Sequence, residues 1–335
     1  MKVGIVLSQF GSILKGGAEI QAENTVKALK LLNIDILYVN QHTNVDELKS
    51  CDIIHFFKSE NYFSILANIL VNHNIPYVVS SVFFPENRIQ LFKNKVFRFI
   101  SLISKKNISL GRFDLWDNAS YIFPNTHDEA RVLEGLSIKK AKLKIIKNAI
   151  ENEYFINNGN IKKQKVNRQN RFVLNVGRIE PRKRQFELIK VCKRINIPLV
   201  LVGDIRDNRY WEKCLSLNFD KLTHYNFSKD KNFLKNMYKS SSVFCLPSTM
   251  ETPGLAALEA YSQGVQIVVT KNGGAKDYFM DSAFYVDPYN ENDIYEKVLE
   301  ALSNPKKHKV NFNSFKYSSV AEDYIKYYKK ILDVS

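Results

Sequence analysis

The chain has 335 residues, of which 45% are hydrophobic, so it is a globular protein long enough for two domains with cores of ordinary size. Its formal net charge of +15 favours contact with nucleic acid, an acidic membrane face or a phosphorylated substrate, although a lysine-rich composition bias gives the same count. The four cysteines are scattered and do not indicate a disulfide framework, which fits a reduced, cytoplasmic compartment.

The first half of the chain alternates short apolar runs with helical segments. The run at 3–7 is too short for a secretion signal, and the stretch at 63–71 is too short to span a bilayer and predicts a core helix. A helix is predicted over 19–32, and strands over 3–7, 34–39, 52–57, 77–82, 121–124 and 144–146. Apolar strands separated by helices indicate a parallel sheet covered on both faces.

A polar segment at 157–170 is the predicted linker, and the alternation restarts after it. Strands are predicted over 172–176, 199–202, 243–246 and 267–269, with a helix starting at Pro181 and a last helix over 319–332. Two successive α/β units predict a ligand cleft between domains, at the carboxyl ends of the strands.

Two basic and acidic segments of the second half carry the candidate chemistry. In the first, Arg182, Lys183 and Arg184 follow Pro181 at the start of a predicted helix, where the helix dipole disfavours cations unless an anion binds there. Solvated charges without a partner are the alternative explanation.

The second segment runs from Pro247 to Gly264 and holds two glutamates eight positions apart. Pro253 and Gly254 break the chain after Glu251, and the apolar residues from Leu255 onward predict a helix that carries Glu259. A carboxylate on an apolar helix face needs a partner, which sugar hydroxyls could provide, while a phosphate could bind the free N–H groups at the helix start. A surface helix with one stray glutamate is the alternative.

Together these segments resemble glycosyltransferase family 4, nucleotide-sugar enzymes of the two-domain GT-B fold. The resemblance rests on Glu-x-x-Gly at 251–254 with a second glutamate at 259, on Gly-Arg-x-x-x-x-Lys at 177–183, and on a Gly-Gly turn at 273–274. Gln266, Asp277 and Ala149 depart from the residues common in the family. The resemblance covers nearly the whole chain, strongly over 172–278 and loosely before 120.

The family assigns roles to the matching positions. It implies that Glu251 meets the donor sugar and Glu259 the ribose, and that Arg178 and Lys183 bind the diphosphate. Gly254 and Leu255 at the helix start are expected to join the donor site. Gly17 is expected there too, because the Gly-Gly-Ala-Glu segment at 16–19 resembles a family loop, although a plain loop explains a lone Gly-Gly turn equally well.

The resemblance also implies an architecture and an activity. We expect two Rossmann-like doubly wound domains, 1–160 on the acceptor side and 161–315 for the nucleotide sugar, facing across a cleft, with a C-terminal helix at 316–335 crossing back to the first domain. The implied function is a retaining hexosyltransferase that uses a nucleoside diphosphate sugar and a glycan or lipid-linked glycan acceptor in cell-envelope polysaccharide biosynthesis. A nucleic-acid-modifying glycosyltransferase, supported by net charge alone, a sugar-nucleotide epimerase and a non-catalytic sugar-nucleotide-binding module are the rivals.

Two expectations concern groups that the chemistry does not require. The chain has no Asp-x-Asp triplet, so we expect no metal and no cofactor, with cations and helix N–H groups stabilising the leaving diphosphate. No general base is assigned, because His55 is better explained as a core residue than as a cleft residue, and His127 could equally be a helix-start residue.

One further segment bears on the acceptor. Apolar residues recur at helical spacing over 88–106, with Phe92, Val96 and Phe99 among them, and lysines and arginines fill the other positions. Such a basic amphipathic helix could lie in an anionic membrane interface at the inner face of the cell membrane, or could pack on the core with a charged outer face. The pattern leaves both possibilities open.

Overall fold

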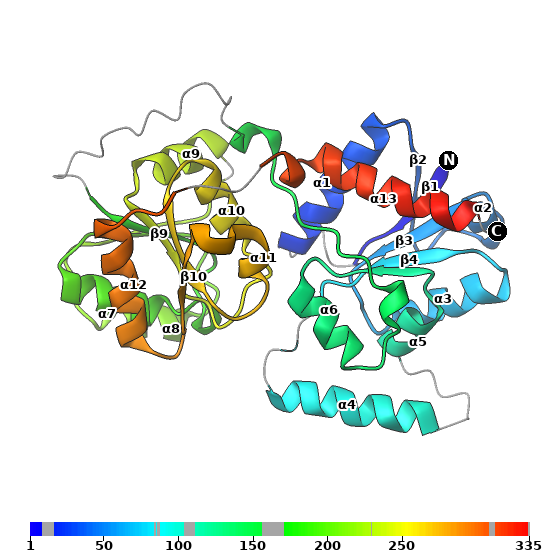
Figure 1. Ribbon diagram of the computed structural model, residues 1–335, viewed down its shortest axis with the longest axis horizontal. Coiled ribbons are helices and arrows are strands. Elements are labelled where there is room, and N and C mark those ends of the chain that lie inside the picture. Colours follow the sequence, from blue (N-terminus) through cyan, green and yellow to red (C-terminus); the bar gives the residue numbers. More distant parts are fainter. Residues whose placement is uncertain are drawn as a thin grey trace. The chain divides into compact units, whose positions relative to one another are not determined.

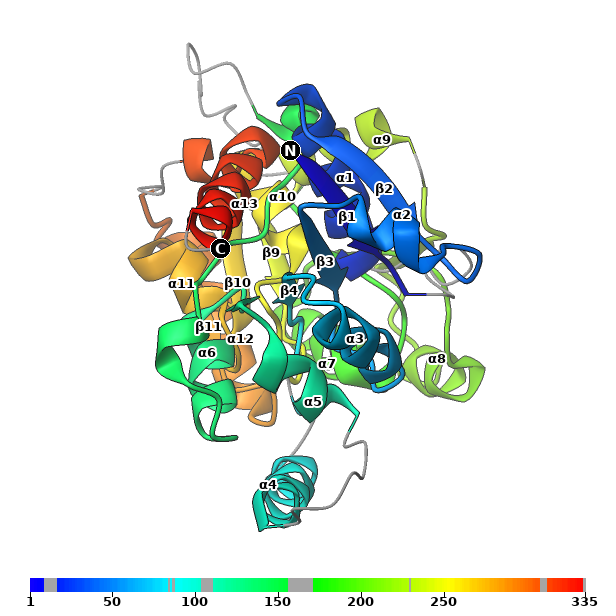
Figure 2. The ribbon, with the colours of Figure 1, turned by 90° about the vertical axis from the view of Figure 1, so that its right-hand side faces the viewer.

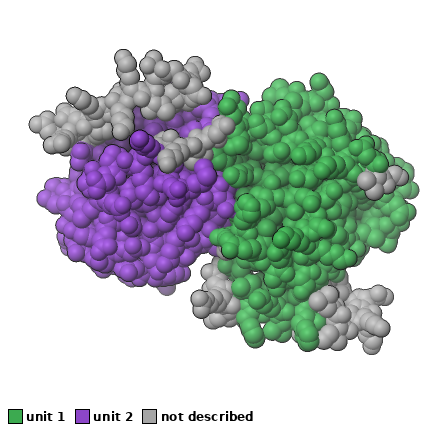
Figure 3. Space-filling model, viewed as in Figure 1, with its two compact units in different colours: residues 1–149, 313–335 green, residues 150–312 purple. Residues whose placement is uncertain are grey.

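The computed structural model describes residues 1–8, 17–83, 85, 88–103, 111–155, 171–228, 230–307 and 312–333. The chain forms two compact units, residues 1–149 with 313–335 and residues 150–312 (Figure 3). The predicted linker at 157–170, including the boundary between 160 and 161, lies outside the described residues. Each unit contains one sheet whose strand pairs are all parallel, which confirms the predicted fold class.

Unit 1 is a five-stranded parallel sheet in the order β2-β1-β3-β4-β5. The strands are β1 (Lys2–Val6), β2 (Asp35–Val39), β3 (Ile53–Phe57), β4 (Tyr77–Ser80) and β5 (Tyr121–Phe123). The helices are α1 (Gly17–Leu31), α2 (Val45–Lys49), α3 (Phe63–Asn72), α4 (Arg88–Ile103), α5 (Arg112–Asn118), α6 (His127–Glu134), the 3-10 turn η1 (Lys140–Lys142) and, from the end of the chain, α13 (Tyr317–Leu332). Two apolar clusters bury the two faces of this sheet, as a parallel sheet requires.

Unit 2 is a six-stranded parallel sheet in the order β11-β10-β9-β6-β7-β8. Its strands are β6 (Val173–Val176), β7 (Leu199–Val202), β8 (Leu222–Tyr225), β9 (Val243–Leu246), β10 (Gln266–Thr270) and β11 (Phe284–Val286). Its helices are α7 (Gln185–Ile195), α8 (Asn208–Leu215), α9 (Lys231–Ser240), α10 (Leu255–Ser262), α11 (Ala275–Phe279) and α12 (Glu291–Ser303), with 3-10 turns η2 (Asn152–Tyr154), η4 (Pro181–Lys183) and η5 (Met280–Ser282); η6 (Phe312–Phe315) leads back to unit 1.

The C-terminal helix α13 belongs to unit 1, where it packs against α1 (Figures 1 and 2). Its Tyr328 hydroxyl lies 2.6 Å from Nδ1 of His55, and the other ring nitrogen of His55 lies 2.8 Å from the Ser80 hydroxyl. Ser80 is also 2.9 Å from the Tyr324 hydroxyl. His55 is fully buried in this network, and burial lowers its pKa to about 3, so it is a core residue that stays neutral.

Two local predictions were wrong. The segment 144–146 is not a strand: an isolated bridge pairs Leu143 with Ile122, and the N–H groups of Lys144 and Ile146 donate to the Ile122 and Pro124 carbonyls, but Pro124 has no N–H to continue the ladder. The helix predicted from Pro181 is interrupted, since η4 ends at Lys183 and Arg184 adopts a left-handed conformation (φ 59°) before α7 begins. The cations therefore lie on a tight turn, not on the first turn of α7.

Helix α4 of unit 1 lies at the bottom of both ribbon views (Figures 1 and 2). Its inward residue is a cation: Arg98 is 5% exposed and makes two hydrogen bonds of 2.7 Å to Asp117 and one of 3.1 Å to the Leu136 carbonyl. Phe92 and Phe99, in contrast, are 67% and 65% exposed. Over 90–99, where its side chains are described, the helix is thus not core-packed with a charged outer face. Among the described residues, no helix is long and apolar enough to cross a membrane.

Candidate active site

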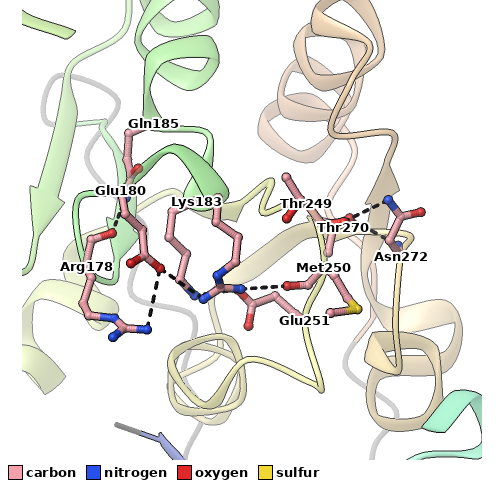
Figure 4. A network of polar contacts seen from close by, with 10 residues as sticks. Arg178, Glu180, Lys183, Gln185, Thr249, Met250, Glu251, Thr270 and Asn272 are labelled. Carbon is pink, nitrogen blue, oxygen red and sulfur yellow. Dashed lines mark hydrogen bonds and ion pairs between the residues drawn. The ribbon is translucent and has the colours of Figure 1, made fainter. Parts of the chain in front are cut away.

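The centre of the candidate site is an ion pair between Lys183 and Glu251 in unit 2. Nζ of Lys183 at the end of η4 lies 2.5 Å from Oε1 of Glu251, which follows β9 (Figure 4). The side chains are 12% and 8% exposed, so both charges are largely removed from water and depend on each other. The two motifs that the sequence predicted as one site are therefore in direct contact.

Backbone hydrogen bonds fix Glu251 against the Gly-Gly turn after β10. Its N–H donates to the Asn272 carbonyl (3.2 Å) and its carbonyl accepts from the Gly274 N–H (2.9 Å). Gly273 adopts φ +89°, and a Cβ on it would lie 2.3 Å from the Glu251 carbonyl oxygen. Glycine is required at position 273 for both conformation and space, which explains the first glycine of the turn.

A second set of bonds joins the turn that carries Lys183 to the same strand end (Figure 4). The Thr249 N–H donates to the Arg182 carbonyl (2.8 Å), and the Arg182 guanidinium donates to the Met250 carbonyl (3.1 Å). The side-chain amide of Asn272 donates to the Thr249 carbonyl (3.0 Å). Lys183 and Glu251 are thus presented by loops that are bonded to each other at the backbone.

The charges around Glu251 determine its ionisation. Burial by itself raises the pKa of a carboxyl group, but the nearby charges of Lys183 and Arg182 outweigh it, and the pKa of Glu251 lies below its usual range. Arg182 contributes from 3.8 Å. Glu251 is therefore a carboxylate at neutral pH and accepts hydrogen bonds only.

Arg178 belongs to the same network, one step removed from the ion pair. Its guanidinium lies 3.6 Å from Oε1 of Glu180, which Arg182 approaches to 3.3 Å, so one carboxylate pairs with both arginines. Its carbonyl accepts a 2.9 Å bond from the amide of buried Gln185. The Arg178 side chain is half-exposed.

Helix α10 starts beside the ion pair. Gly254 precedes Leu255, the first residue of α10, and has φ +86°. A Cβ on Gly254 would lie 2.9 Å from a Leu246 methyl and 3.2 Å from Oε2 of Glu251. The N–H groups of the first turn of α10 therefore follow directly from the Glu251 segment, as the sequence predicts.

Glu259 lies further along α10 and has a different partner. Its Oε2 accepts a 2.8 Å hydrogen bond from the hydroxyl of Tyr238, on α9. Burial raises the pKa of Glu259 to about 7, while the bond from Tyr238 lowers it. Glu259 and Glu251 are on one segment but in separate polar environments.

Gly17 is the first residue of α1 in unit 1, and the remainder of its loop, 9–16, lies outside the described residues. A pocket of about 230 Å³ in unit 1 lies beside it, lined by Leu7, Ser8, Ala18, Glu19, Ala22, Glu23, Phe57 and Lys58. The predicted donor role of Gly17 remains a prediction.

Sequence reasoning did not identify Glu180 and Tyr238 as parts of the site, and it expected Arg182 at a helix start, not beside the Met250 carbonyl. Glu180 and Arg182 occupy variable positions of the Gly-Arg-x-x-x-x-Lys motif, so the motif assigns no role to their charged side chains. Tyr238 is 21 positions from Glu259 and only the packing of α9 on α10 reveals it. Among the described residues, no group of three His, Cys, Asp or Glu side chains is arranged to hold a metal ion.

Comparisons with known proteins agree with this fold. Residues 157–317 match the family "Glycosyl transferases group 1". An uncharacterized glycosyltransferase of Methanocaldococcus jannaschii is 25% identical over 318 residues, covering 86% of this chain and 85% of the relative. The Campylobacter jejuni enzyme N-acetylgalactosamine-N,N'-diacetylbacillosaminyl-diphospho-undecaprenol 4-alpha-N-acetylgalactosaminyltransferase is 27% identical over 287 residues, covering 81% and 72%.

A solved structure extends the similarity to the whole fold. The crystal structure of Anabaena HepE in complex with UDP superposes with a TM-score of 0.69 at 16% identity, covering 100% of this chain and 99% of that one. The two doubly wound units are therefore those of the GT-B fold. Residues 157–317, somewhat less than half of the chain, are thus similar to the group 1 glycosyltransferases, and the two relatives that cover most of its length are glycosyltransferases, which supports the class that the motifs predicted.

Proposed function

We propose that this chain is a retaining, metal-independent glycosyltransferase that moves a hexose-type sugar from a nucleoside diphosphate sugar to a glycan or lipid-linked glycan in cell-envelope polysaccharide biosynthesis. The buried ion pair between Lys183 and Glu251 carries this proposal. Glu251, a carboxylate whose pKa lies below its usual range, can accept hydrogen bonds from the hydroxyls of a sugar. The adjacent Lys183 ammonium offers a positive charge to the phosphate that leaves the sugar. The rival of a non-catalytic binding module does not require both groups at one point.

The leaving group determines what the cations do. When the bond from the anomeric carbon to the diphosphate oxygen breaks, negative charge grows on that oxygen. Lys183 and Arg178 stabilise this charge, together with the N–H groups at the start of α10, in a site that is preorganised by the backbone bonds around Glu251. Glu180 pairs with Arg178, and Arg182 bonds the η4 turn to the Met250 carbonyl beside Glu251.

Retention of configuration fits a site to which no general base is assigned. In front-face attack, the acceptor hydroxyl bonds to the anomeric carbon on the side that the diphosphate leaves, and the departing phosphate oxygen takes the hydroxyl proton. The name of the Campylobacter relative specifies an α-linked product. An α-linked donor gives such a product in one transfer only when the configuration is retained.

A lipid-linked acceptor is supported by that relative and by α4. The relative's name places its acceptor on diphospho-undecaprenol. On α4, Phe92, Val96 and Phe99 follow one another on one exposed face, with Lys93 and Lys95 on either side at about 100° per residue. A stripe of this kind matches the apolar and anionic layers of the inner face of a membrane, where a polyprenyl diphosphate is held.

Donor binding and turnover test the proposal. The purified chain is screened by thermal shift against UDP-, GDP- and ADP-sugars, starting with UDP-sugars because HepE binds UDP. Release of nucleoside diphosphate is then measured with and without a polyprenyl-diphosphate-linked sugar, and the anomeric configuration of the product is read by NMR. Acceptor-dependent release with a retained configuration is expected, also in the presence of a chelator. Formation of an epimer without release would replace the proposal with an epimerase.

A further inference from the structure

The further inference concerns Tyr238 and rests on the proposed function, because it assumes that a nucleoside diphosphate binds to unit 2. We propose that Tyr238 is a positioning residue for the ribose of the donor, acting through Glu259. Its hydroxyl donates a 2.8 Å hydrogen bond to Oε2 of Glu259. It thereby sets the direction in which this carboxylate presents its remaining lone pairs.

Tyr238 is well suited to fix a neighbour because it is itself fixed. The residue has no exposed surface, and its ring packs edge-on against Tyr154 (6.3 Å between centroids) and Phe244 (5.9 Å). Gln263, just after α10, donates a 2.7 Å bond to the Tyr154 carbonyl and ties that ring to the helix carrying Glu259. The hydroxyl therefore points at Glu259 without losing rotamer entropy when a ligand arrives.

The Glu259 carboxylate, which Tyr238 orients, can accept further hydrogen bonds. A carboxylate has about four lone-pair directions, and the bond from Tyr238 uses one of them. The others suit the vicinal hydroxyls of a ribose, which is how acidic residues recognise this sugar in other doubly wound folds. Glu259 is only half-buried, so a ligand can reach it.

Other charged groups act on Glu259 and must be considered with Tyr238. Glu151 raises the pKa of Glu259 and Lys231 of α9 lowers it, and Lys231 itself pairs with Glu151 and with Glu153. Glu259 must be ionised to accept from two hydroxyls. Loss of the Tyr238 hydroxyl removes a donor to the ionised form, so the carboxyl would protonate at a higher pH.

The experiment compares ribonucleotides with deoxyribonucleotides. Binding of UDP, ADP and GDP, and of each 2'-deoxy counterpart, is measured by calorimetry for the wild type, Tyr238→Phe, Glu259→Gln and the double variant. Tyr210→Phe is the matched control, because its part-buried hydroxyl accepts from the Phe186 N–H elsewhere in unit 2. Midpoint temperatures establish that each variant is folded.

The expected result is a loss of ribose preference. Tyr238→Phe should reduce the ratio of ribo to deoxyribo affinity roughly fivefold to tenfold. Tyr238→Phe should also raise the pH below which nucleotide affinity is lost. In the Glu259→Gln background, the same change should alter neither this pH nor the affinity ratio. Tyr210→Phe should leave both the affinity ratio and the pH dependence of nucleotide binding unchanged.

Three outcomes would overturn the inference. An unchanged affinity ratio and pH dependence in Tyr238→Phe would make the residue merely structural. Equal binding of ribo- and deoxyribonucleotides by the wild type would remove the ribose contact while leaving the proposed transfer intact. A wild type that binds no nucleoside diphosphate would refute the proposed function itself, and the inference with it.

Discussion

Nζ of Lys183 lies 2.5 Å from Oε1 of Glu251, although 68 positions separate the two residues in the chain. Burial makes each charge costly without the other, so the pair favours a structure in which the η4 turn lies against the segment that follows β9. It also means that the cation offered to a phosphate is already desolvated and oriented before the donor arrives. Electrostatic preorganisation of this kind requires no rearrangement during reaction.

Lys183→Ala should weaken donor binding and transfer together, because the diphosphate charge that Lys183 neutralises grows in the transition state. We expect kcat/KM to fall roughly 100-fold and the free energy of unfolding to fall by about 2 kcal/mol, since Glu251 keeps only Arg182 as a cation nearby. Steady-state kinetics and denaturant unfolding measure the two effects.

Lys190→Ala is the matched control for that change. Lys190 is on α7 in the same unit and pairs with Glu291 at the surface, so its removal should cost less than about 1 kcal/mol and leave kinetics unchanged. Unaltered kinetics in Lys183→Ala would remove this residue from the site.

Glu251→Gln should impair transfer more than nucleotide binding. The amide keeps the shape of the side chain but loses the charge that faces Lys183 and one of the acceptor oxygens offered to the donor sugar. We expect kcat to fall roughly 100-fold and the nucleoside diphosphate Kd to change by about threefold or less. If kcat and the affinity for the nucleoside diphosphate fall by the same factor, Glu251 has a structural role instead. Glu291→Gln, in a surface pair, serves as control.

The sequence predicted most strands because buried parallel strands are continuous apolar runs. The two strands it missed, β8 and β11, are the edges of the sheet in unit 2. The residues of β8 alternate between half-buried and exposed, and β11 has three residues. An edge strand has a neighbouring strand on one side only and is often short or partly exposed, so the apolar run in its sequence is weaker.

The site was predictable to the extent that its motifs are contiguous. Glu251, Gly254 and Lys183 could be named from spacing, and the structure brings them together. The contacts of Tyr238 and Glu180 depend on how helices and turns pack, which no local pattern specifies. The sequence also does not specify which face of α4 packs on the rest of unit 1, because its periodicity is compatible with either. The buried Arg98 and its bonds to Asp117 show which face does.

Glu129 on α6 should give unit 1 a distinct pH dependence of stability. Its carboxyl accepts from the Ser81 hydroxyl (2.6 Å) and from the N–H groups of Phe83 (2.7 Å) and Asn125 (2.9 Å), which joins the ends of β4 and β5. Burial raises its pKa from 4.5 to about 6 despite these bonds. The folded state thus holds this proton more tightly than the unfolded state does.

The sign of the effect follows from linkage. A raised pKa in the folded state adds stability below pH 4.5, and this increment is lost as pH rises through about 6. The free energy of unfolding of the wild type relative to Glu129→Gln should therefore be about 2 kcal/mol higher at pH 4.5 than at pH 7. Glu134→Gln, at an exposed position on the same helix, should show a constant difference; a constant difference for Glu129→Gln as well would contradict the prediction.

The apolar stripe of α4 should bind anionic vesicles. Phe92→Ser with Phe99→Ser should lower co-sedimentation with phosphatidylglycerol vesicles at least roughly tenfold, because each phenyl ring transferred to the interface contributes on the order of 1 kcal/mol or more. Ile65→Ser is the control, since Ile65 is equally exposed (67%) on α3 of the same unit. Transfer to a water-soluble acceptor should be unchanged in both variants, because the ion pair of Lys183 lies in the other unit. If the double variant binds vesicles as well as the wild type does, the stripe is not the contact with the membrane. If salt does not weaken vesicle binding, Lys93 and Lys95 beside the stripe make no electrostatic contribution to it.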